Sequence, residues 1–295
     1  MITLSLWLFF LQIFPGFDIS HLIAPGAQLT LVANQFSFTE GPARHPNGDI
    51  YFTDQPNDRI WVYTTSEQLL LYKEGTGRAN GLYFHPNGTL WACSDELNEI
   101  RAYDVASLSY QLIMPGRYQG KRFNGPNDLW IHPTTKTVYF TDPFYVRPYW
   151  QHKTPDLDKK GVYRLMEGKQ VPELLEEGLV QPNGIIGSPD GRFLYVADIK
   201  DQKTYRYSIL ADGTLSQRML FAEMGSDGMT IDALGNIYLT GKGVTIFNPK
   251  GEKIGHIPVP EPWTANVTFG GKDQKTLFIT ASKSVYTLKM QVAGR

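Results

Sequence analysis

The sequence is poor in cysteine and in charged residues, and both shortages exclude classes of protein. Its only cysteine among 295 residues is Cys93, which excludes an intrachain disulfide and a zinc site built from several thiolates. A single thiol inside a strand-like segment is best interpreted as a small buried hydrophobic group. Charged residues make up 19% of the chain, the formal net charge is −1, and there is no basic run. We therefore expect no nucleic-acid partner and no binding to an anionic membrane surface.

Apolar runs long enough to cross a bilayer are also missing. The first fourteen residues are nearly all apolar but stop at Pro15-Gly16, which is short for a membrane span. That length suits the core of a signal peptide, although no Lys or Arg precedes the run and no clear cleavage site follows it. We predict no integral membrane span. Residues 1–20 are either a signal peptide of a periplasmic or secreted protein, or an N-terminal extension of a cytoplasmic one.

The chain contains a repeated pattern of short strands and turns. Its 28 glycines and 19 prolines are spread out, as expected for many short strands joined by tight turns. A polar residue begins an apolar strand, and a Pro/Gly turn and a second apolar strand follow. The six copies begin at Glu40, Asn80, Asn127, Asn183, Asp227 and Asn266. Their starts are 39 to 56 residues apart, which suits four-stranded blades. We predict an all-β fold, a six-bladed β-propeller over residues 28–290.

The two ends of this region predict how the propeller closes. After Asn266 there is room for only three strands before the chain ends at Arg295. A strand-like segment, residues 29–33, precedes the first copy. We expect this N-terminal strand to supply the outer strand of the sixth blade, which would close the ring and hide two sheet edges.

The six residues that begin the copies, called the ring residues below, should point into the central channel. All six carry side-chain oxygens, and two of them, Glu40 and Asp227, are carboxylates. Converging carboxylate and amide oxygens suit a hard divalent cation, Ca²⁺ before Mg²⁺. The alternative is that Asn and Asp merely cap turns. Recurrence at the same phase in all six copies, including a Glu, favours the cation site.

Other polar residues divide between the two ends of the blades. Three histidines lie in the turns at the end opposite the ring residues, and we expect them to be structural: His45, His85 and His132. Three aspartates end second strands near the ring residues: Asp54, Asp142 and Asp198. These aspartates either form a second layer around the cation or cap turns, and the sequence leaves both open.

One connection is unusually long. Residues 143–160 form an aromatic and basic loop on the side of the ring residues, and long loops in compact domains tend to be functional. We interpret it as a lid over the cation, with Tyr145 and His152 as candidates for substrate contact. Arg122, shortly before the third ring residue, either binds a substrate hydroxyl or carboxylate or lies on the surface.

An ordered set of short motifs carries a family resemblance. The motifs are Glu40-Gly41-Pro42, Arg122-Phe123-Asn124-Gly125-Pro126-Asn127-Asp128, Pro182-Asn183-Gly184, Ser188-Pro189-Asp190-Gly191 and Ser226-Asp227-Gly228-Met229. From about Leu31 to Leu288 the chain resembles the gluconolactonase family, which also contains senescence marker protein 30 type lactonases and luciferin-regenerating enzymes. Asn80-Gly81-Leu82 is similar to the bacterial branch, whereas Trp263-Thr264 departs from the expected pattern.

This resemblance implies hydrolysis of a sugar lactone, such as glucono-1,5-lactone, to the aldonic acid. It implies a divalent cation, most simply Ca²⁺ with Mg²⁺, Zn²⁺ or Mn²⁺ as alternatives. The implied metal ligands are Glu40, Asn127, Asn183 and Asp227. Asp227 would also act as general base. The implied substrate-binding residue is Arg122, and Asn80 and Asn266 would line the channel. We also predict that Asn80 and Asn127 contact the substrate.

Two other functions remain open at this point. A phosphotriester or aryl-ester hydrolase could use the same cation, and a non-catalytic propeller could use calcium only to stabilise a binding module. The chain has no Gly-x-Ser-x-Gly motif, so a serine hydrolase of that type is not indicated.

Overall fold

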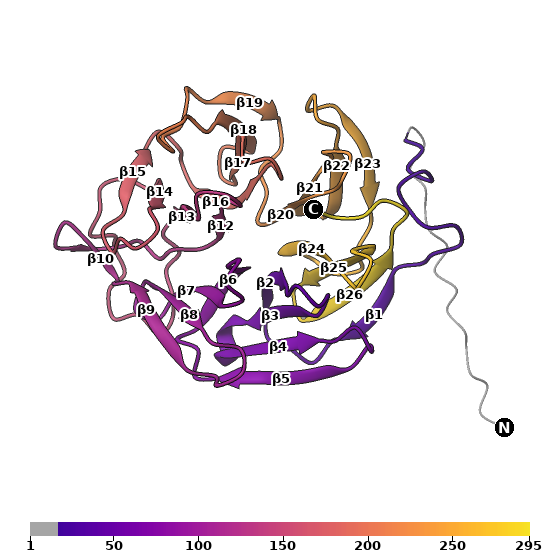
Figure 1. Ribbon diagram of the computed structural model, residues 1–295, viewed down its shortest axis with the longest axis horizontal. Helices are drawn as coiled ribbons and strands as arrows, with labels where there is room; N and C mark the ends of the chain where they lie inside the picture. Colours follow the sequence, from indigo (N-terminus) through magenta and orange to yellow (C-terminus); the bar gives the residue numbers. More distant parts are fainter. Residues whose placement is uncertain (1–16) are drawn as a thin grey trace.

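The computed structural model describes residues 17–295, which form a six-bladed β-propeller (Figure 1). Six four-stranded antiparallel sheets surround a central channel, as the repeats predict. The only helix among the described residues is a single 3₁₀ turn, η1 (Gln55–Asn57), and no helix in this range is long and apolar enough to span a membrane. The apolar run of residues 1–14 lies outside the described residues.

The blades follow one another along the chain. Blade 1 contains β2 (Thr39–Arg44), β3 (Ile50–Asp54), β4 (Arg59–Tyr63) and β5 (Leu69–Glu74), and blade 2 contains β6 (Ala79–Phe84), β7 (Leu90–Ser94), β8 (Glu99–Tyr103) and β9 (Tyr110–Met114). A small hairpin, β10 (Arg117–Tyr118) and β11 (Lys121–Arg122), precedes blade 3, which contains β12 (Leu129–Ile131), β13 (Val138–Asp142), β14 (Gly161–Leu165) and β15 (Glu173–Glu176).

The second half repeats the arrangement. Blade 4 contains β16 (Pro182–Gly187), β17 (Phe193–Asp198), β18 (Lys203–Ser208) and β19 (Met219–Ala222), and blade 5 contains β20 (Met229–Ile231), β21 (Ile237–Gly241), β22 (Gly243–Phe247) and β23 (Lys253–Ile257). Blade 6 contains β24 (Asn266–Gly270), β25 (Thr276–Ala281) and β26 (Ser284–Lys289). The first strand of each blade lies next to the channel (Figure 1).

The fourth strand of blade 6 comes from the other end of the chain. β1 (Thr30–Ala33) pairs antiparallel with β26, and the order of the sheet is β1-β26-β25-β24. Thr30 lies opposite Thr287, and Figure 1 shows the indigo β1 beside the yellow β26. The predicted closure by an N-terminal strand is confirmed.

Each second strand is buried on both faces, because neighbouring blades cover it. β3, β13 and β25, for example, are buried along their whole length, and they read as continuous runs of Val, Ile, Leu, Tyr, Phe and Thr. Aromatic rings fill the space between sheets, as where Phe52 of β3 in blade 1 contacts Phe278 of β25 in blade 6, with ring centroids 5.3 Å apart. The core therefore lies between the blades and leaves the channel to polar residues.

The aspartates that end second strands are caps. The Asp142 carboxylate accepts the backbone N–H groups of Asn124 and Gly125, at 3.0 and 2.8 Å, just before the inner strand of the same blade. Asp54 and Asp198 each make the same pair of contacts in their own blades. Of the two roles that the sequence left open, the structure shows turn capping.

The three histidines of the opposite turns are structural, as expected. The Nδ1 atom of His132 accepts the backbone N–H groups of Thr134 and Thr135, both at 3.1 Å. The Nδ1 atoms of His45 and His85 accept backbone N–H groups within their own turns in the same way.

Candidate active site

The ring residues meet at one pocket of about 270 Å³. Four of them line it directly, and a fifth, Asn183, donates a hydrogen bond from Nδ2 to Asp227 Oδ1 at 2.8 Å. The complete lining is Phe38, Glu40, Gln55, Asn80, Asn127, Tyr145, Arg147, Ile199, Asp227 and Trp263. Residues from all parts of the chain therefore converge on a space that suits one small ring.

Glycines let neighbouring inner strands come close enough to build this pocket. A Cβ atom on Gly41, where φ is +45°, would lie 2.0 Å from the carbonyl oxygen of Asn80 in the next blade. A Cβ on Gly184 would lie 2.8 Å from the carbonyl oxygen of Asp227. The glycine after a ring residue is thus the place where the next ring residue packs, which explains the recurring Glu-Gly, Asn-Gly and Asp-Gly pairs.

Threonines in the second strands bind the backbone carbonyl groups of ring residues in the next blade. Thr53 Oγ1 donates to the carbonyl oxygen of Asn80 at 3.1 Å, and Thr141 Oγ1 donates to that of Asn183 at 2.7 Å. Both bonds run from one blade to the ring residue of the next. The channel is therefore preorganised by buried contacts between blades.

Asp227 is held by two donors. Its Oδ2 accepts the indole N–H of Trp263 at 2.6 Å, and its Oδ1 accepts the Asn183 amide. Burial raises the pKa of Asp227 to about 6, although the two hydrogen bonds lower it. Trp263, which departs from the expected pattern, thus binds the predicted catalytic residue directly.

Glu40 is buried beside it. Its Oε2 accepts the Gly41 N–H at 2.6 Å and the Asn266 amide at 3.2 Å. Burial raises the pKa of Glu40 well above its ordinary value, and the neighbouring Asp227 carboxylate raises it further. Asn266 itself does not line this pocket but a second one of about 220 Å³. Two buried carboxylates that repel each other create a strong demand for a cation.

The other donors fit such a cation. The Oδ1 atoms of Asn80 and Asn183 are buried without a hydrogen-bond partner. Within residues 17–295 no group of three or more His, Cys, Asp or Glu side chains could hold a metal, so any ion here would rely on two carboxylates and amide oxygens. Oxygen-only ligands of this kind suit Ca²⁺, whereas Zn²⁺ favours nitrogen and sulfur.

The remaining predicted contacts divide between two pockets. Tyr145 lines the central pocket, and its hydroxyl accepts the Asn183 amide at 2.7 Å. Arg122 forms an ion pair with Asp156 at 3.2 Å and lines a separate pocket of about 570 Å³. His152 lines that second pocket too, stacked on Trp150 at 4.6 Å.

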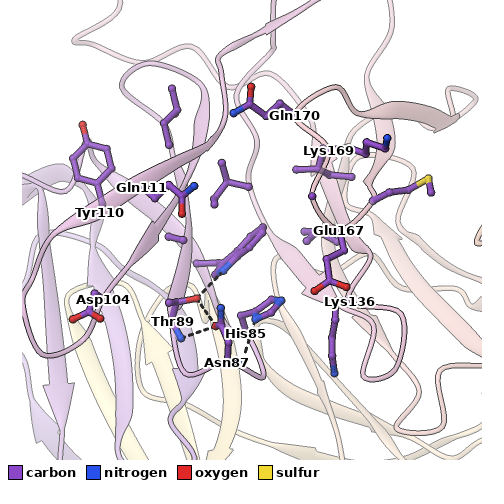
Figure 2. A pocket seen from close by; sticks show the side chains of 18 of the residues that line it. His85, Asn87, Thr89, Asp104, Tyr110, Gln111, Lys136, Glu167, Lys169 and Gln170 are labelled. Carbon is purple, nitrogen blue, oxygen red and sulfur yellow. Dashed lines mark hydrogen bonds between the residues drawn. The ribbon is translucent and has the colours of Figure 1, made fainter.

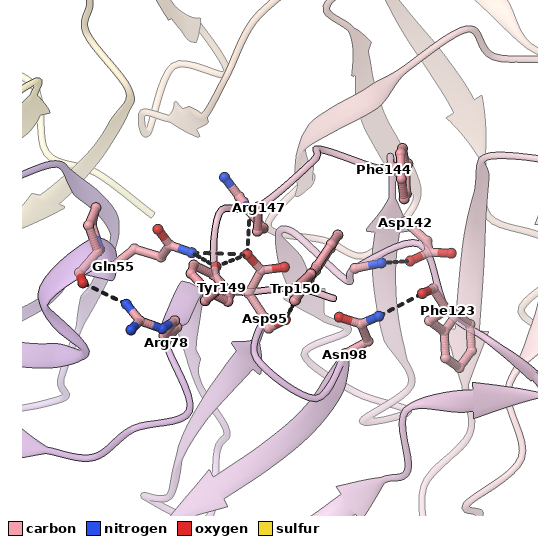
Figure 3. A network of polar contacts seen from close by, with 12 residues as sticks. Gln55, Arg78, Asp95, Asn98, Phe123, Asp142, Phe144, Arg147, Tyr149 and Trp150 are labelled. Carbon is pink, nitrogen blue, oxygen red and sulfur yellow. Dashed lines mark hydrogen bonds and ion pairs between the residues drawn. The ribbon is translucent and has the colours of Figure 1, made fainter. Parts of the chain in front are cut away.

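Five lining residues were not predicted: Phe38, Gln55, Arg147, Ile199 and Trp263. Gln55 and Arg147 both bind the Asp95 carboxylate, which Figure 3 shows between them. Neither stands at a repeat position. The only available signals were the length of the loop that carries Arg147 and the unusual Trp263.

A groove of about 490 Å³ lies between blades 2 and 3, lined by β9 of blade 2 and by the turn between β14 and β15 of blade 3 (Figure 2). Its polar groups bond to one another: Thr89 donates to Asn87 at 2.7 Å, and the Trp91 indole donates to Thr89 at 3.0 Å. None of the unpartnered buried polar atoms of residues 17–295 lies in it. The central pocket is the better candidate site.

Comparison with known proteins agrees with this arrangement. Residues 38–283 match the family model described as SMP-30/Gluconolactonase/LRE-like region. The chain belongs to this family. A gluconolactonase of Zymomonas mobilis is 30% identical over 90% of this chain and 82% of its own. The solved structure of a Xanthomonas campestris gluconolactonase is 28% identical, with a TM-score of 0.84 over 92% of each chain.

A more distant family structure shows the shared fold. Regucalcin of Agrobacterium tumefaciens, described as a calcium-binding protein, is 20% identical, with a TM-score of 0.76 over 91% of this chain and 96% of its own. The six-bladed family architecture thus extends to proteins of low sequence identity.

Proposed function

We propose that this protein hydrolyses a sugar lactone, such as glucono-1,5-lactone, to the aldonic acid with the help of a divalent cation. The cation would be held by Glu40, Asn127, Asn183 and Asp227, and Ca²⁺ suits this donor set best. The supporting observation is the pair of buried, mutually repelling carboxylates in a pocket with unpartnered amide oxygens. The gluconolactonase relatives support the lactone as substrate.

When bound, the cation would supply positive charge against the oxyanion that develops as a lactone carbonyl is attacked. Asp227 is the group that accepts the proton of the attacking water, at a carboxylate whose orientation Trp263 and Asn183 fix. In the metal-free protein burial raises its pKa to about 6, and a bound cation would lower that pKa, so Asp227 would be a weak base and the cation would carry most of the acceleration.

The rest of the lining suits a polyhydroxylated ring. Asn80 offers an unpartnered acceptor, Tyr145 a phenolic hydroxyl, and Gln55 a side-chain amide, all facing the same pocket. The pocket volume of about 270 Å³ suits a single ring, and Tyr145 and Arg147 of the 143–160 loop form part of its wall. We therefore propose a single-ring lactone as substrate.

The test is hydrolysis of glucono-1,5-lactone, followed by proton release after subtraction of its spontaneous opening. Protein stripped with a chelator is compared with samples given Ca²⁺, Mg²⁺, Zn²⁺ or Mn²⁺. We expect activity to vanish on stripping and to return best with Ca²⁺. Undiminished activity after complete stripping would reject the cation.

A parallel assay with a phosphotriester and an aryl ester addresses the other hydrolase. Turnover of these substrates, with none of the lactone, would replace the proposal by a phosphotriester or aryl-ester hydrolase. No turnover of any substrate with any ion, despite a calcium-dependent rise in thermal stability, would favour a binding module.

A further inference from the structure

The 143–160 loop belongs to blade 3, but it is anchored to both neighbouring blades. Tyr145 contacts Asn183 in blade 4, and Arg147 binds Asp95, which follows β7 in blade 2. The loop therefore spans blades 2 to 4 and brings Tyr145 and Arg147 into the pocket.

Asp95 is the anchor on the blade 2 side. Its side chain is only 3% exposed, and one oxygen, Oδ2, accepts three hydrogen bonds (Figure 3). The donors are Arg147 Nε at 2.5 Å, Tyr149 Oη at 2.7 Å and Gln55 Nε2 at 2.9 Å. The indole N–H of Trp150 adds a bond to the Asp95 carbonyl at 2.9 Å. Arg147 is thus held rigidly, and its charge is offset by a buried carboxylate.

The outer part of the Arg147 side chain is available to a ligand. Its two terminal nitrogens form no hydrogen bond within residues 17–295, and the guanidinium lies 5.5 Å from the Tyr145 ring. The same side chain lines the central pocket together with Glu40 and Asp227. It therefore brings free donors to the same pocket as the two carboxylates.

Charge decides which ligand these donors suit. The Arg147–Asp95 pair is neutral as a whole, and the two channel carboxylates match a divalent cation. A pocket balanced in this way has no positive charge left for a second acid group on the substrate. Because Asp95 neutralises the charge of the guanidinium, its planar N–H donors suit the neutral hydroxyl oxygens of a polyol.

We propose that Arg147 is a specificity-determining residue that donates to hydroxyl oxygens of an uncharged polyhydroxy lactone, and that Asp95 makes the site select against lactones with a second acid group. This inference rests on the proposed lactone hydrolysis. Arg147 positions the ring, and it takes no part in proton transfer.

The experiment measures KM and kcat for glucono-1,5-lactone, and the inhibition constant of glucaro-1,4-lactone, which carries a free carboxylate. In Arg147→Gln we expect KM to rise about tenfold while kcat stays within about threefold, because uniform binding is lost. Its calcium-induced thermal shift should match that of the unchanged protein, which a general structural defect would not allow. Arg147→Lys should give an intermediate KM.

Asp95→Asn tests the charge argument. It leaves the guanidinium uncompensated, so the ratio of the glucaro-lactone inhibition constant to the gluconolactone KM should fall about tenfold. Arg192→Gln, which removes an exposed arginine paired with Asp190, is the matched control and should change neither constant.

The outcomes separate this inference from the proposed function. Absence of lactone turnover by the unchanged protein overturns the function. Normal turnover combined with an unaltered KM in Arg147→Gln overturns the role of Arg147, and this variant decides the matter even if Asp95→Asn does not fold. An unaltered preference in folded Asp95→Asn overturns the charge argument.

Discussion

Glu40 and Asp227 lie far apart in the sequence, yet each raises the cost of ionising the other. Neither forms an ion pair with Lys or Arg among the described residues. Arg147, which lowers the pKa of Asp227, is itself paired with Asp95. The hydrogen bonds of the two carboxylates come from amides, an indole and the backbone. Hydrogen bonds stabilise a carboxylate but do not cancel its charge. At the scale of single residues, the site therefore contains two buried carboxylates whose negative charges are not neutralised by an ion pair.

Asp227→Asn tests this view directly. The amide retains the size of the carboxylate and can still accept the Trp263 bond, but it supplies neither the charge for a cation nor a base. We expect lactone hydrolysis to fall on the order of 100-fold or more and the calcium-induced thermal shift to disappear. Asp190→Asn, in an exposed turn, is the control. Near-normal activity in Asp227→Asn would refute the assignment.

The difference between predicted and unpredicted site residues has a physical basis. Glu40 and Asp227 stand at the same phase of a repeat, and in a closed ring equal phase means equal position around the channel. Arg147 reaches the pocket only because Asp95, in another blade, binds it. Such a contact depends on the tertiary path of a loop. This path is not reflected in any sequence repeat, so the repeat pattern could not predict it.

Among the elements, the second strands β3 and β13 each have two structural roles. In β3 and β13 the closing Thr-Asp pair divides two functions: the threonine bonds to the ring residue of the next blade, and the aspartate caps the entry to its own inner strand. The sequence showed that these aspartates recur. It did not show their role, because capping and second-layer contacts use the same residue type at the same strand end.

Asp198→Ala should be a stability variant. It removes the acceptor of the Val180 and Gln181 N–H groups, at 2.6 and 2.9 Å, in a buried position. We expect the free energy of unfolding to fall by about 2–3 kcal/mol, measured by urea titration. Asp273→Ala, which removes an exposed turn acceptor, should cost less than about 0.5 kcal/mol. Equal effects of the two substitutions would contradict the capping role.

At the scale of the whole molecule, closure of the ring was predictable in full. Counting strands after Asn266 left one position open, and the only unassigned strand was at the start of the chain. The structure pairs β1 with β26 there. A strand count depends on composition and periodicity alone, which explains why this prediction succeeded where the path of the 143–160 loop was not predictable.

A chain that starts at residue 36 lacks β1 and exposes the edge of β26. We expect its thermal midpoint to fall by roughly 10 °C, because several kcal/mol of strand pairing and packing are lost, and we expect association through the free edge. A chain that starts at residue 17 is the control. Thermal unfolding and size-exclusion chromatography measure both effects, and a monomer of unchanged midpoint would argue against closure by β1.

The stability of the metal-free protein should depend on pH in an unusual direction. The pKa of Asp227 is raised to about 6 and that of Asp128 to about 7 by burial, and Glu40 is raised as well. The folded state therefore holds protons that the unfolded chain releases above about pH 4, and stability is lost as pH rises through about 6 to 7.

Urea midpoints in the presence of a chelator should therefore fall between about pH 5.5 and about pH 8. Added Ca²⁺ should remove much of this fall, because it stabilises both ionised carboxylates of the pocket. Asp227→Asn should show a flatter dependence without metal. A midpoint that stays constant or rises over this range in the metal-free protein would contradict the raised pKa values.

The pairing of β1 with β26 also determines when the propeller can close during translation. β1 is among the first strands to leave the ribosome, and its partner is among the last, since Thr30 pairs with Thr287. Blade 6 cannot be completed, and the ring cannot close, until β26 has been translated after the strands of blades 1 to 5. Until then the nascent chain carries an unmatched strand of only four residues, which is short enough to limit mispairing with neighbouring chains.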